Sequence, residues 1–119
     1  VQILLWNIKK PETNEGNRKY FARPLPAAVL EDTQVIFNGF EPNKTYTVSI
    51  ETIGYHSGDA YNAYLEGNFT ENPTRKEIAE LIEQSKPKKK TFPVTADEKG
   101  MLSFAVPQME NSADLIIIE

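Results

Sequence analysis

The sequence has no cysteine and a single histidine, His56, in 119 residues. Disulfide cross-links and thiolate metal sites are therefore excluded, and so is a metal site built from several histidines. Long hydrophobic runs are also missing, since no stretch approaches the roughly 20 apolar residues that a membrane-spanning helix needs. We expect no metal ion, no cofactor and no membrane partner.

Positive charge is scarce as well. Lysine and arginine number 13 against 17 acidic residues, so the net charge is −4, which argues against a nucleic-acid-binding domain. The only basic run comprises Lys86 and Lys88–Lys90, and we interpret it as a solvated linker between a helix and a strand.

The sequence contains no secretory signal. It begins within an apolar strand pattern at Val1 and ends in another at Leu115–Ile118. This pattern indicates one domain, residues 1–119, cut from a longer polypeptide. A chain of this length can bury about 60–70% of its unfolded surface in a single core. The sequence does not predict the compartment, because a signal would lie before Val1.

Several short segments have the composition of β-strands. Residues Thr45–Ile53 alternate between apolar and polar side chains, which is typical of a half-buried strand. Val1–Ile8 is apolar at almost every position, which predicts a strand covered on both faces, with Trp6 in the core or in an interface. Further strand candidates are Arg18–Phe21, Thr33–Phe40, Thr91–Ala96, Leu102–Val106 and Ala113–Glu119.

Turn signals separate these strands. Asp97–Gly100 predicts a hairpin turn with glycine in the left-handed region, and Pro93 places its strand at a sheet edge. Lys9–Asn17 is polar and is expected to be a loop. The course of residues 9–28 is not predicted further.

One helix is predicted at about Thr74–Ser85. Thr74 and Glu77 have the spacing of a capping box, in which each side chain satisfies a backbone N–H of the first turn. Ile78, Leu81 and Ile82 fall on one face, and burying each would contribute about 1.5–3 kcal/mol. We therefore expect this face to pack on the sheets. The fold class is a mainly β, antiparallel, immunoglobulin/fibronectin-like β-sandwich with this one lateral helix.

The most distinctive segment contains His56-Ser57, Ala60-Tyr61, Tyr64 and Asn72-Pro73-Thr74. These residues and their spacing resemble the C-terminal β-sandwich of glycoside hydrolase family 39, the β-xylosidases related to α-L-iduronidase. That family typically has His-Ser-Asn-Ala-Tyr, an aromatic residue three positions later, and Asn-Pro-Thr at the head of a helix. Leu4–Asn7 resembles the strand that follows the family's catalytic barrel.

The resemblance implies a non-catalytic C-terminal accessory domain of a β-xylosidase-like enzyme. The acid/base and the nucleophile of the family lie on the barrel, so no residue of this chain inherits a catalytic role. The implied partner is the catalytic barrel of the same polypeptide. Subunit contacts in a homo-oligomeric parent are a second expected role.

Five residues are candidates for a loop that faces another domain or the substrate cleft, with xylo-oligosaccharide as the candidate ligand: His56, Ser57, Asp59, Tyr61 and Tyr64. Each also has a structural interpretation. Gly58-Asp59 is typical of a turn, and tyrosines bury their rings where helix, loop and sheet meet.

Two other functions stay open at this stage. The aromatic residues Tyr55, Tyr61, Tyr64 and Phe69 would suit the sugar-stacking platform of a carbohydrate-binding module. Pro42–Tyr46, before an alternating strand, favours a fibronectin-like interaction or spacer domain. The sequence does not predict the substrate of the parent enzyme.

Overall fold

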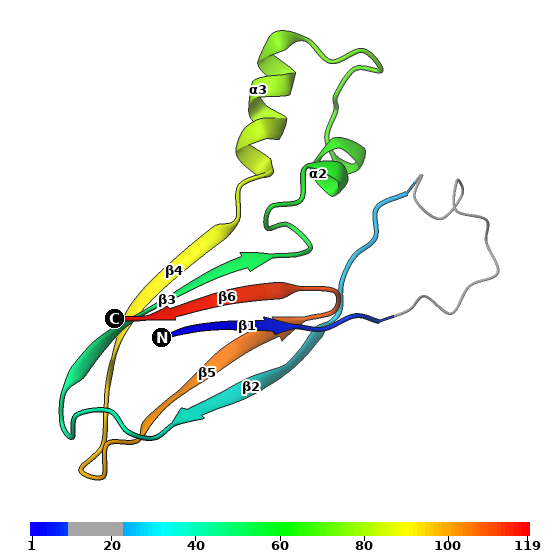
Figure 1. The fold of residues 1–119 in the computed structure, drawn as a ribbon. Helices are drawn as coiled ribbons and strands as arrows, with labels where there is room; N and C mark the ends of the chain where they lie inside the picture. Colours follow the sequence, from blue (N-terminus) through cyan, green and yellow to red (C-terminus); the bar gives the residue numbers. More distant parts are fainter. Residues whose placement is uncertain (10–22) are drawn as a thin grey trace.

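The structure, a computed structural model, describes residues 1–9 and 23–119 (Figure 1). Within these ranges the chain forms six strands and two helices. Their bounds are β1 Gln2–Trp6, β2 Val29–Phe37, β3 Thr45–Ile53, α2 Ala60–Glu66, α3 Arg75–Gln84, β4 Lys88–Thr95, β5 Leu102–Met109 and β6 Ala113–Ile118.

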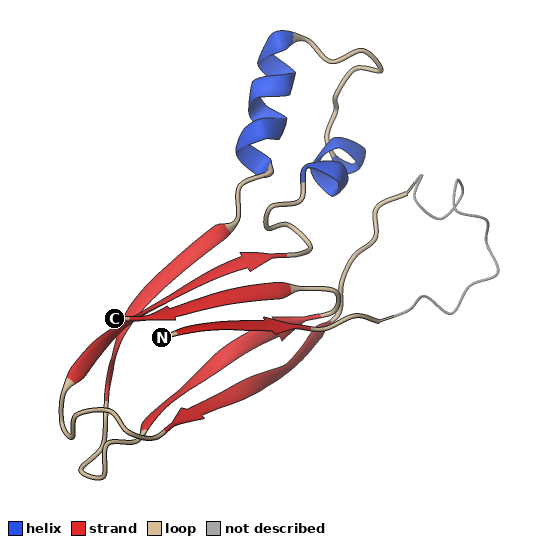
Figure 2. Ribbon diagram, viewed as in Figure 1, coloured by secondary structure: helices blue, strands red, loops and turns tan. Residues whose placement is uncertain are grey.

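The strands form two antiparallel sheets, as Figure 2 shows. The larger sheet has the order β1-β6-β3-β4, and the smaller sheet contains β2 and β5. The first and last strands are neighbours, with Leu4 opposite Leu115. The ammonium group of Val1 donates a hydrogen bond of 2.8 Å to the Ile118 carbonyl oxygen. The predicted antiparallel β-sandwich is confirmed.

The core consists of alternating side chains from both sheets. In β5 Leu102, Phe104 and Val106 are buried while the residues between them are exposed, as predicted. The Phe92 ring of β4 packs edge-on against Phe104, with centroids 6.0 Å apart. The buried hydrophobic residues are Val35, Val48, Ile50, Ala96, Leu102, Phe104, Val106, Ile116 and Ile118.

The turn at Asp97–Gly100 confirms the predicted glycine conformation. Gly100 has φ 75°, and a Cβ there would lie 2.3 Å from the carbonyl oxygen of Phe40. The turn joins β4 to β5, which belong to different sheets, so the predicted hairpin within one sheet is wrong. Pro93 does lie on an edge strand, because β4 is the last strand of the larger sheet.

Only one face of β1 is covered, which corrects the expectation of a strand buried on both faces. Ile3 and Leu5 pack against the core. Leu4 and Trp6 point the other way and are 62% and 64% exposed. Trp6 is therefore not a core residue. The reason is topological: the second sheet covers only one side of the first.

The interpretation of the lysine run as a linker is wrong for three of its four residues. Lys88, Lys89 and Lys90 are the first residues of β4. Lysines on an edge strand disfavour pairing with another chain. Only Lys86 lies in the connection, where its ammonium group is 2.6 Å from a Glu83 carboxylate oxygen.

The structure has a second helix that the sequence pattern did not predict. Asp59 caps α2 at its N-terminus, and the helix ends at Gly67. A Cβ on Gly67 would lie 2.3 Å from the Phe69 ring, so the close approach of this ring requires glycine. The predicted helix is confirmed as α3, with Thr74 and Ser85 as its caps and a complete capping box between Thr74 and Glu77.

The apolar face of α3 is not buried against the sheets, contrary to expectation. Ile78 and Ile82 are 47% and 55% exposed. Among the described elements α3 packs only on α2, and the two helices extend beyond one end of the sandwich (Figure 1). We call residues 58–87 the helical arm.

The strand candidate Arg18–Phe21 lies outside the described residues, and so does the loop predicted at Lys9–Asn17 except for its first residue. Neither of the two described helices has the length and apolar character to cross a bilayer.

Candidate functional site

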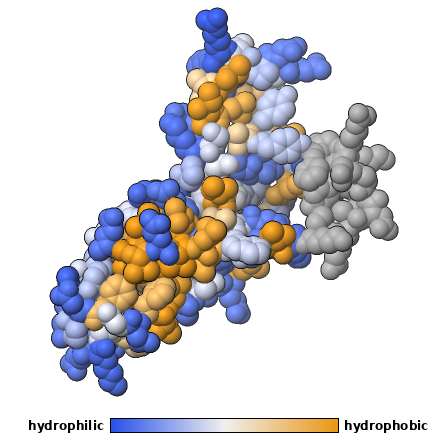
Figure 3. Space-filling model, viewed as in Figure 1, coloured by the Kyte–Doolittle hydropathy of each residue, from blue (hydrophilic) through white to orange (hydrophobic). Residues whose placement is uncertain are grey.

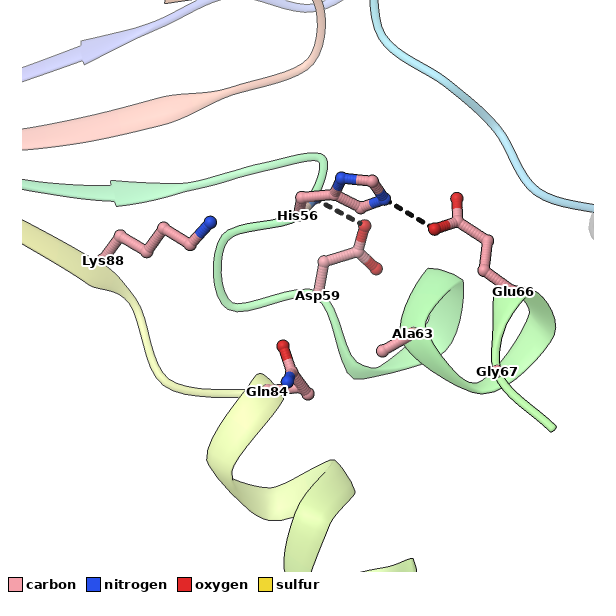
Figure 4. A pocket seen from close by; sticks show the side chains of 7 residues that line it. All are labelled: His56, Asp59, Ala63, Glu66, Gly67, Gln84 and Lys88. Carbon is pink, nitrogen blue, oxygen red and sulfur yellow. Dashed lines mark hydrogen bonds and ion pairs between the residues drawn. The ribbon is translucent and has the colours of Figure 1, made fainter. Parts of the chain in front are cut away.

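A pocket of about 360 Å³ opens where the helical arm meets the sandwich (Figure 4). Its lining comes from the turn after β3, from both helices and from the start of β4. Its lining residues are His56, Asp59, Ala63, Glu66, Gly67, Gln84 and Lys88.

A tight turn after β3 places His56 at the pocket. The backbone N–H of Gly54 donates to the Ser57 oxygen at 2.8 Å, and the N–H of Ser57 donates back at 2.9 Å. His56 has φ 59°, a left-handed conformation that non-glycine residues rarely adopt. Such strained residues gather at functional sites, where the surrounding structure holds them in place.

Two neighbours fix the imidazole ring. Tyr55 stacks on it, with centroids 3.9 Å apart and planes inclined by 22°. The His56 Nε2 atom lies 2.6 Å from Glu66 Oε2, and the Tyr55 hydroxyl donates to Glu66 Oε1 at 2.8 Å. The hydrogen bond from Tyr55 is the largest cause of a lowered pKa of Glu66, and the bond from His56 is the second. The bond between Tyr55 and Glu66 also raises the pKa of Tyr55.

Asp59 holds α2 in place through both carboxylate oxygens. Oδ1 accepts from the Asn62 backbone N–H at 3.0 Å, and Oδ2 accepts from the Asn62 amide at 2.7 Å and from the His56 N–H at 3.3 Å. Asn62 is buried, and its Oδ1 accepts from the Leu25 N–H at 2.8 Å. Asp59 and Asn62 thus connect the arm to the segment that precedes β2.

Ser57 joins β3 to β4 below the arm. Its buried hydroxyl donates to the Thr52 carbonyl oxygen and accepts from the Lys88 backbone N–H at 2.9 Å. This residue therefore has a structural role and does not line the pocket.

The five candidate residues separate into two groups. His56 and Asp59 line the pocket, whereas Ser57 is buried and does not line it. Tyr64 stacks on Phe69, with ring centroids 6.1 Å apart, and Tyr61 is 46% exposed on α2. Neither tyrosine lines the pocket.

Sequence reasoning missed Glu66, Gln84 and Lys88 as pocket residues. The sequence did contain a signal for the short helix that carries Glu66, because Asp59 and Gly67 have the residue types that cap a helix. Gln84 and Lys88 come from the end of α3 and the start of β4, and no local pattern relates them to His56.

The two carboxylates of the pocket do not suit glycoside hydrolysis. That reaction needs one carboxyl group with a raised pKa as the acid and another as nucleophile or base. The pKa of Glu66 is shifted downward, and the oxygens of Asp59 are taken up by the helix cap. Nor do the described residues contain a group of three or more potential metal ligands.

The aromatic residues proposed as a sugar platform form two separate stacks. Tyr55 pairs with His56, and Tyr64 pairs with Phe69. The described side chains thus present no single aromatic surface across the arm.

Comparisons with known proteins identify the fold. No known family model matches this chain, and no curated protein matches it in sequence. A solved GH39 enzyme from Xanthomonas axonopodis pv. citri superposes with a TM-score of 0.84 at 18% identity, over 99% of this chain and 23% of that one. A monomeric beta-xylosidase from Caulobacter crescentus CB15 superposes with a TM-score of 0.80 at 22% identity, over 99% of this chain and 24% of that one.

This chain therefore spans about a quarter of the length of the solved enzymes that it matches. The resemblance to glycoside hydrolase family 39 is confirmed at the level of the fold: the chain is built like one part of these larger enzymes.

Proposed function

We propose that this chain is a non-catalytic, C-terminal accessory domain of a β-xylosidase-like glycoside hydrolase, and that it packs on the catalytic barrel of the same polypeptide. The observation that carries the proposal is the fold match, which takes in almost all of this chain and less than a quarter of each enzyme. Together with the carboxylate chemistry of the pocket, it supports a domain whose parent cleaves the bond elsewhere.

The exposed face of the larger sheet supplies a surface for such packing. Trp6 lies opposite Ala113, which in turn lies opposite Ile53 of β3. Residues that are opposite in register share a face of the sheet. Leu4, Trp6, Ile53, Ala113, Leu115 and Ile117 form what we call the outer sheet face. Figure 3 shows apolar side chains gathered over the larger sheet and on α3.

One pair of opposite charges lies beside the outer sheet face. Glu51 lies next to Leu115 in register, and its carboxylate is 3.1 Å from the Lys89 ammonium group. An apolar centre with polar residues at its rim is typical of a surface that another folded body covers. An apolar face of this kind rarely stays open to water in a mature protein.

A partner in the same polypeptide fits better than a second copy. The matching Caulobacter crescentus enzyme is described as monomeric, so a covered surface on its corresponding part would face its own chain. Ile53 directly precedes the Gly54–Ser57 turn. A barrel on the outer sheet face would therefore lie close to the pocket.

Hydrolysis of an aryl β-xyloside tests the non-catalytic role. We expect the 119-residue chain to release the phenol of this substrate no faster than buffer alone does. Turnover that disappears in the Glu66→Gln or Asp59→Asn variant would overturn the proposal, because it would place the chemistry on this chain.

A further inference from the structure

The pocket where the helical arm meets the sandwich contains two carboxylates that already accept hydrogen bonds, and two polar side chains that make none with the described residues. Both oxygens of Glu66 and both oxygens of Asp59 already accept hydrogen bonds. In contrast, the side chains of Gln84 and Lys88 have no hydrogen-bond or ion-pair partner among the described residues, and both line the pocket. The pocket thus offers an amide and an ammonium group to a ligand.

His56 adds an acceptor. Its Nε2 is taken up by Glu66, which leaves Nδ1 available. When Nε2 carries the proton and donates to the Glu66 carboxylate, Nδ1 has a lone pair and accepts a hydrogen bond. The side chain of His56 is 50% exposed, so a ligand can reach it.

We propose that this pocket binds one ring of a neutral sugar, with His56, Gln84 and Lys88 as its polar contacts. The inference rests on the proposed function, which supplies the class of sugar, a xylo-oligosaccharide. Sugar hydroxyls donate and accept, so they match an imidazole acceptor, an ammonium donor and an amide that does both.

The size of the pocket suits a single ring. Its volume of about 360 Å³ lies near the lower end of the roughly 300–1,000 Å³ range for ligand pockets. Because the pocket is open to solvent, further sugar units can extend out of it.

The charges of the lining favour a neutral ligand. An anion would meet the carboxylates of Asp59 and Glu66, and a cation would meet the ammonium group of Lys88. A neutral polyol meets no like charge on either side.

The imidazole is held in place before any ligand arrives. Tyr55 covers one of its faces, Glu66 holds its Nε2, and the backbone N–H of His56 is bonded to Asp59. Binding to a fixed group costs less conformational entropy than binding to a mobile one.

The test uses His56 as a reporter, because it is the only histidine of the chain. Its ring C–H signals are followed by NMR while xylobiose is added to the 119-residue protein. We expect a saturable shift with a dissociation constant on the order of millimolar. Gln84→Ala and Lys88→Ala should each weaken binding by about threefold to tenfold, the effect of losing one hydrogen bond.

Lys89→Ala is the matched control. Lys89 is the neighbour of Lys88, and its ammonium group is paired with Glu51 outside the pocket. This substitution should leave the affinity unchanged. No shift up to about 50 mM xylobiose would overturn the proposal, and so would a shift that Gln84→Ala and Lys88→Ala do not weaken.

A failure of the sugar site and a failure of the proposed function can be told apart. If xylobiose does not bind while the chain still lacks turnover, the sugar site falls and the proposed function stands. If the chain itself hydrolyses a xyloside, the proposed function falls whatever the His56 signal does.

Discussion

At the scale of single residues, the polar side chains at the root of the arm connect segments that are far apart in the sequence. Ser57 joins the end of β3 to the start of β4, and Asp59 caps α2. Glu66, the last residue of α2, binds the imidazole ring of His56. His56 is therefore the residue of this group whose placement suits contact with a ligand.

The capping box of α3 gives a pH dependence with a defined sign. Hydrogen bonds from the backbone and the hydroxyl of Thr74, with those from Thr70, lower the pKa of Glu77 from 4.5 to about 2. A carboxyl group whose pKa is lower in the folded state stabilises that state above its unfolded pKa. This contribution is lost as the pH falls from about 4.5 through about 2.

We predict that Glu77→Gln reduces the helical ellipticity at 222 nm at pH 7, and that its difference from the wild type shrinks as the pH approaches 2. Glu80→Gln is the control, because Glu80 lies on the same helix and makes no side-chain hydrogen bond to any described residue. It should follow the wild type throughout. A difference for Glu77→Gln that stays constant down to pH 2 would contradict the assigned role of the capping box.

At the scale of elements, the helical arm and the sandwich differ in how they are stabilised. None of the α3 residues is buried, and α3 packs only on α2 among the described elements. In the sandwich, Val48 and Ile116 are fully buried on neighbouring strands of the larger sheet. Segments with few buried contacts open locally, at a lower free energy than the core.

We therefore predict that the amides of α3 exchange hydrogen for deuterium much faster than those of β3 and β6. Peptide-resolved exchange measured by mass spectrometry checks this. Equal protection in α3 and β3 would mean that the arm unfolds only together with the sandwich.

Local signals explain which elements could be predicted. The alternation in β3 and β5 and the capping box of α3 lie within a few residues of the chain, and all three were predicted. The helix α2 was missed because seven residues are too few to form a stable helix alone. Its cap, Asp59, was interpreted as part of a turn. The start of β4 was missed because Lys88–Lys90 does not have the composition of a strand.

The pocket was only half predictable for a related reason. His56 and Asp59 belong to the distinctive segment and were found. Gln84 and Lys88 reach the pocket because the chain leaves the sandwich after β3 and returns at β4, a path that depends on long-range strand pairing. The exposure of the α3 apolar face follows from the same path.

At the scale of the whole molecule, the sandwich has a buried inner face and an exposed apolar outer face on the same sheet. A leucine-to-alanine substitution should therefore affect stability very differently on the two faces. Leu102→Ala removes a fully buried side chain and should reduce the free energy of unfolding by about 2–5 kcal/mol. Leu4→Ala removes a side chain that is 62% exposed and should change it by at most about 0.5 kcal/mol.

Urea unfolding of the 119-residue chain measures both values. A loss for Leu4→Ala as large as that for Leu102→Ala would show that the outer sheet face is covered in the chain on its own, for example by self-association. That result would remove the surface proposed for the barrel.

Hydroxyl-radical footprinting with peptide mass spectrometry tests the accessory role most directly. It compares the 119-residue chain alone with the proposed longer polypeptide, in which this domain would be joined to a catalytic barrel. Trp6, which is 64% exposed, should be oxidised readily in the chain alone and protected in the longer polypeptide. Met101 is 38% exposed and lies directly before β5, whereas Asn7, the neighbour of Trp6, contacts Met109 at the other end of that strand; Met101 should react alike in both. Equal oxidation of Trp6 in the two proteins would contradict the account, because the outer sheet face would then have no partner in its own polypeptide.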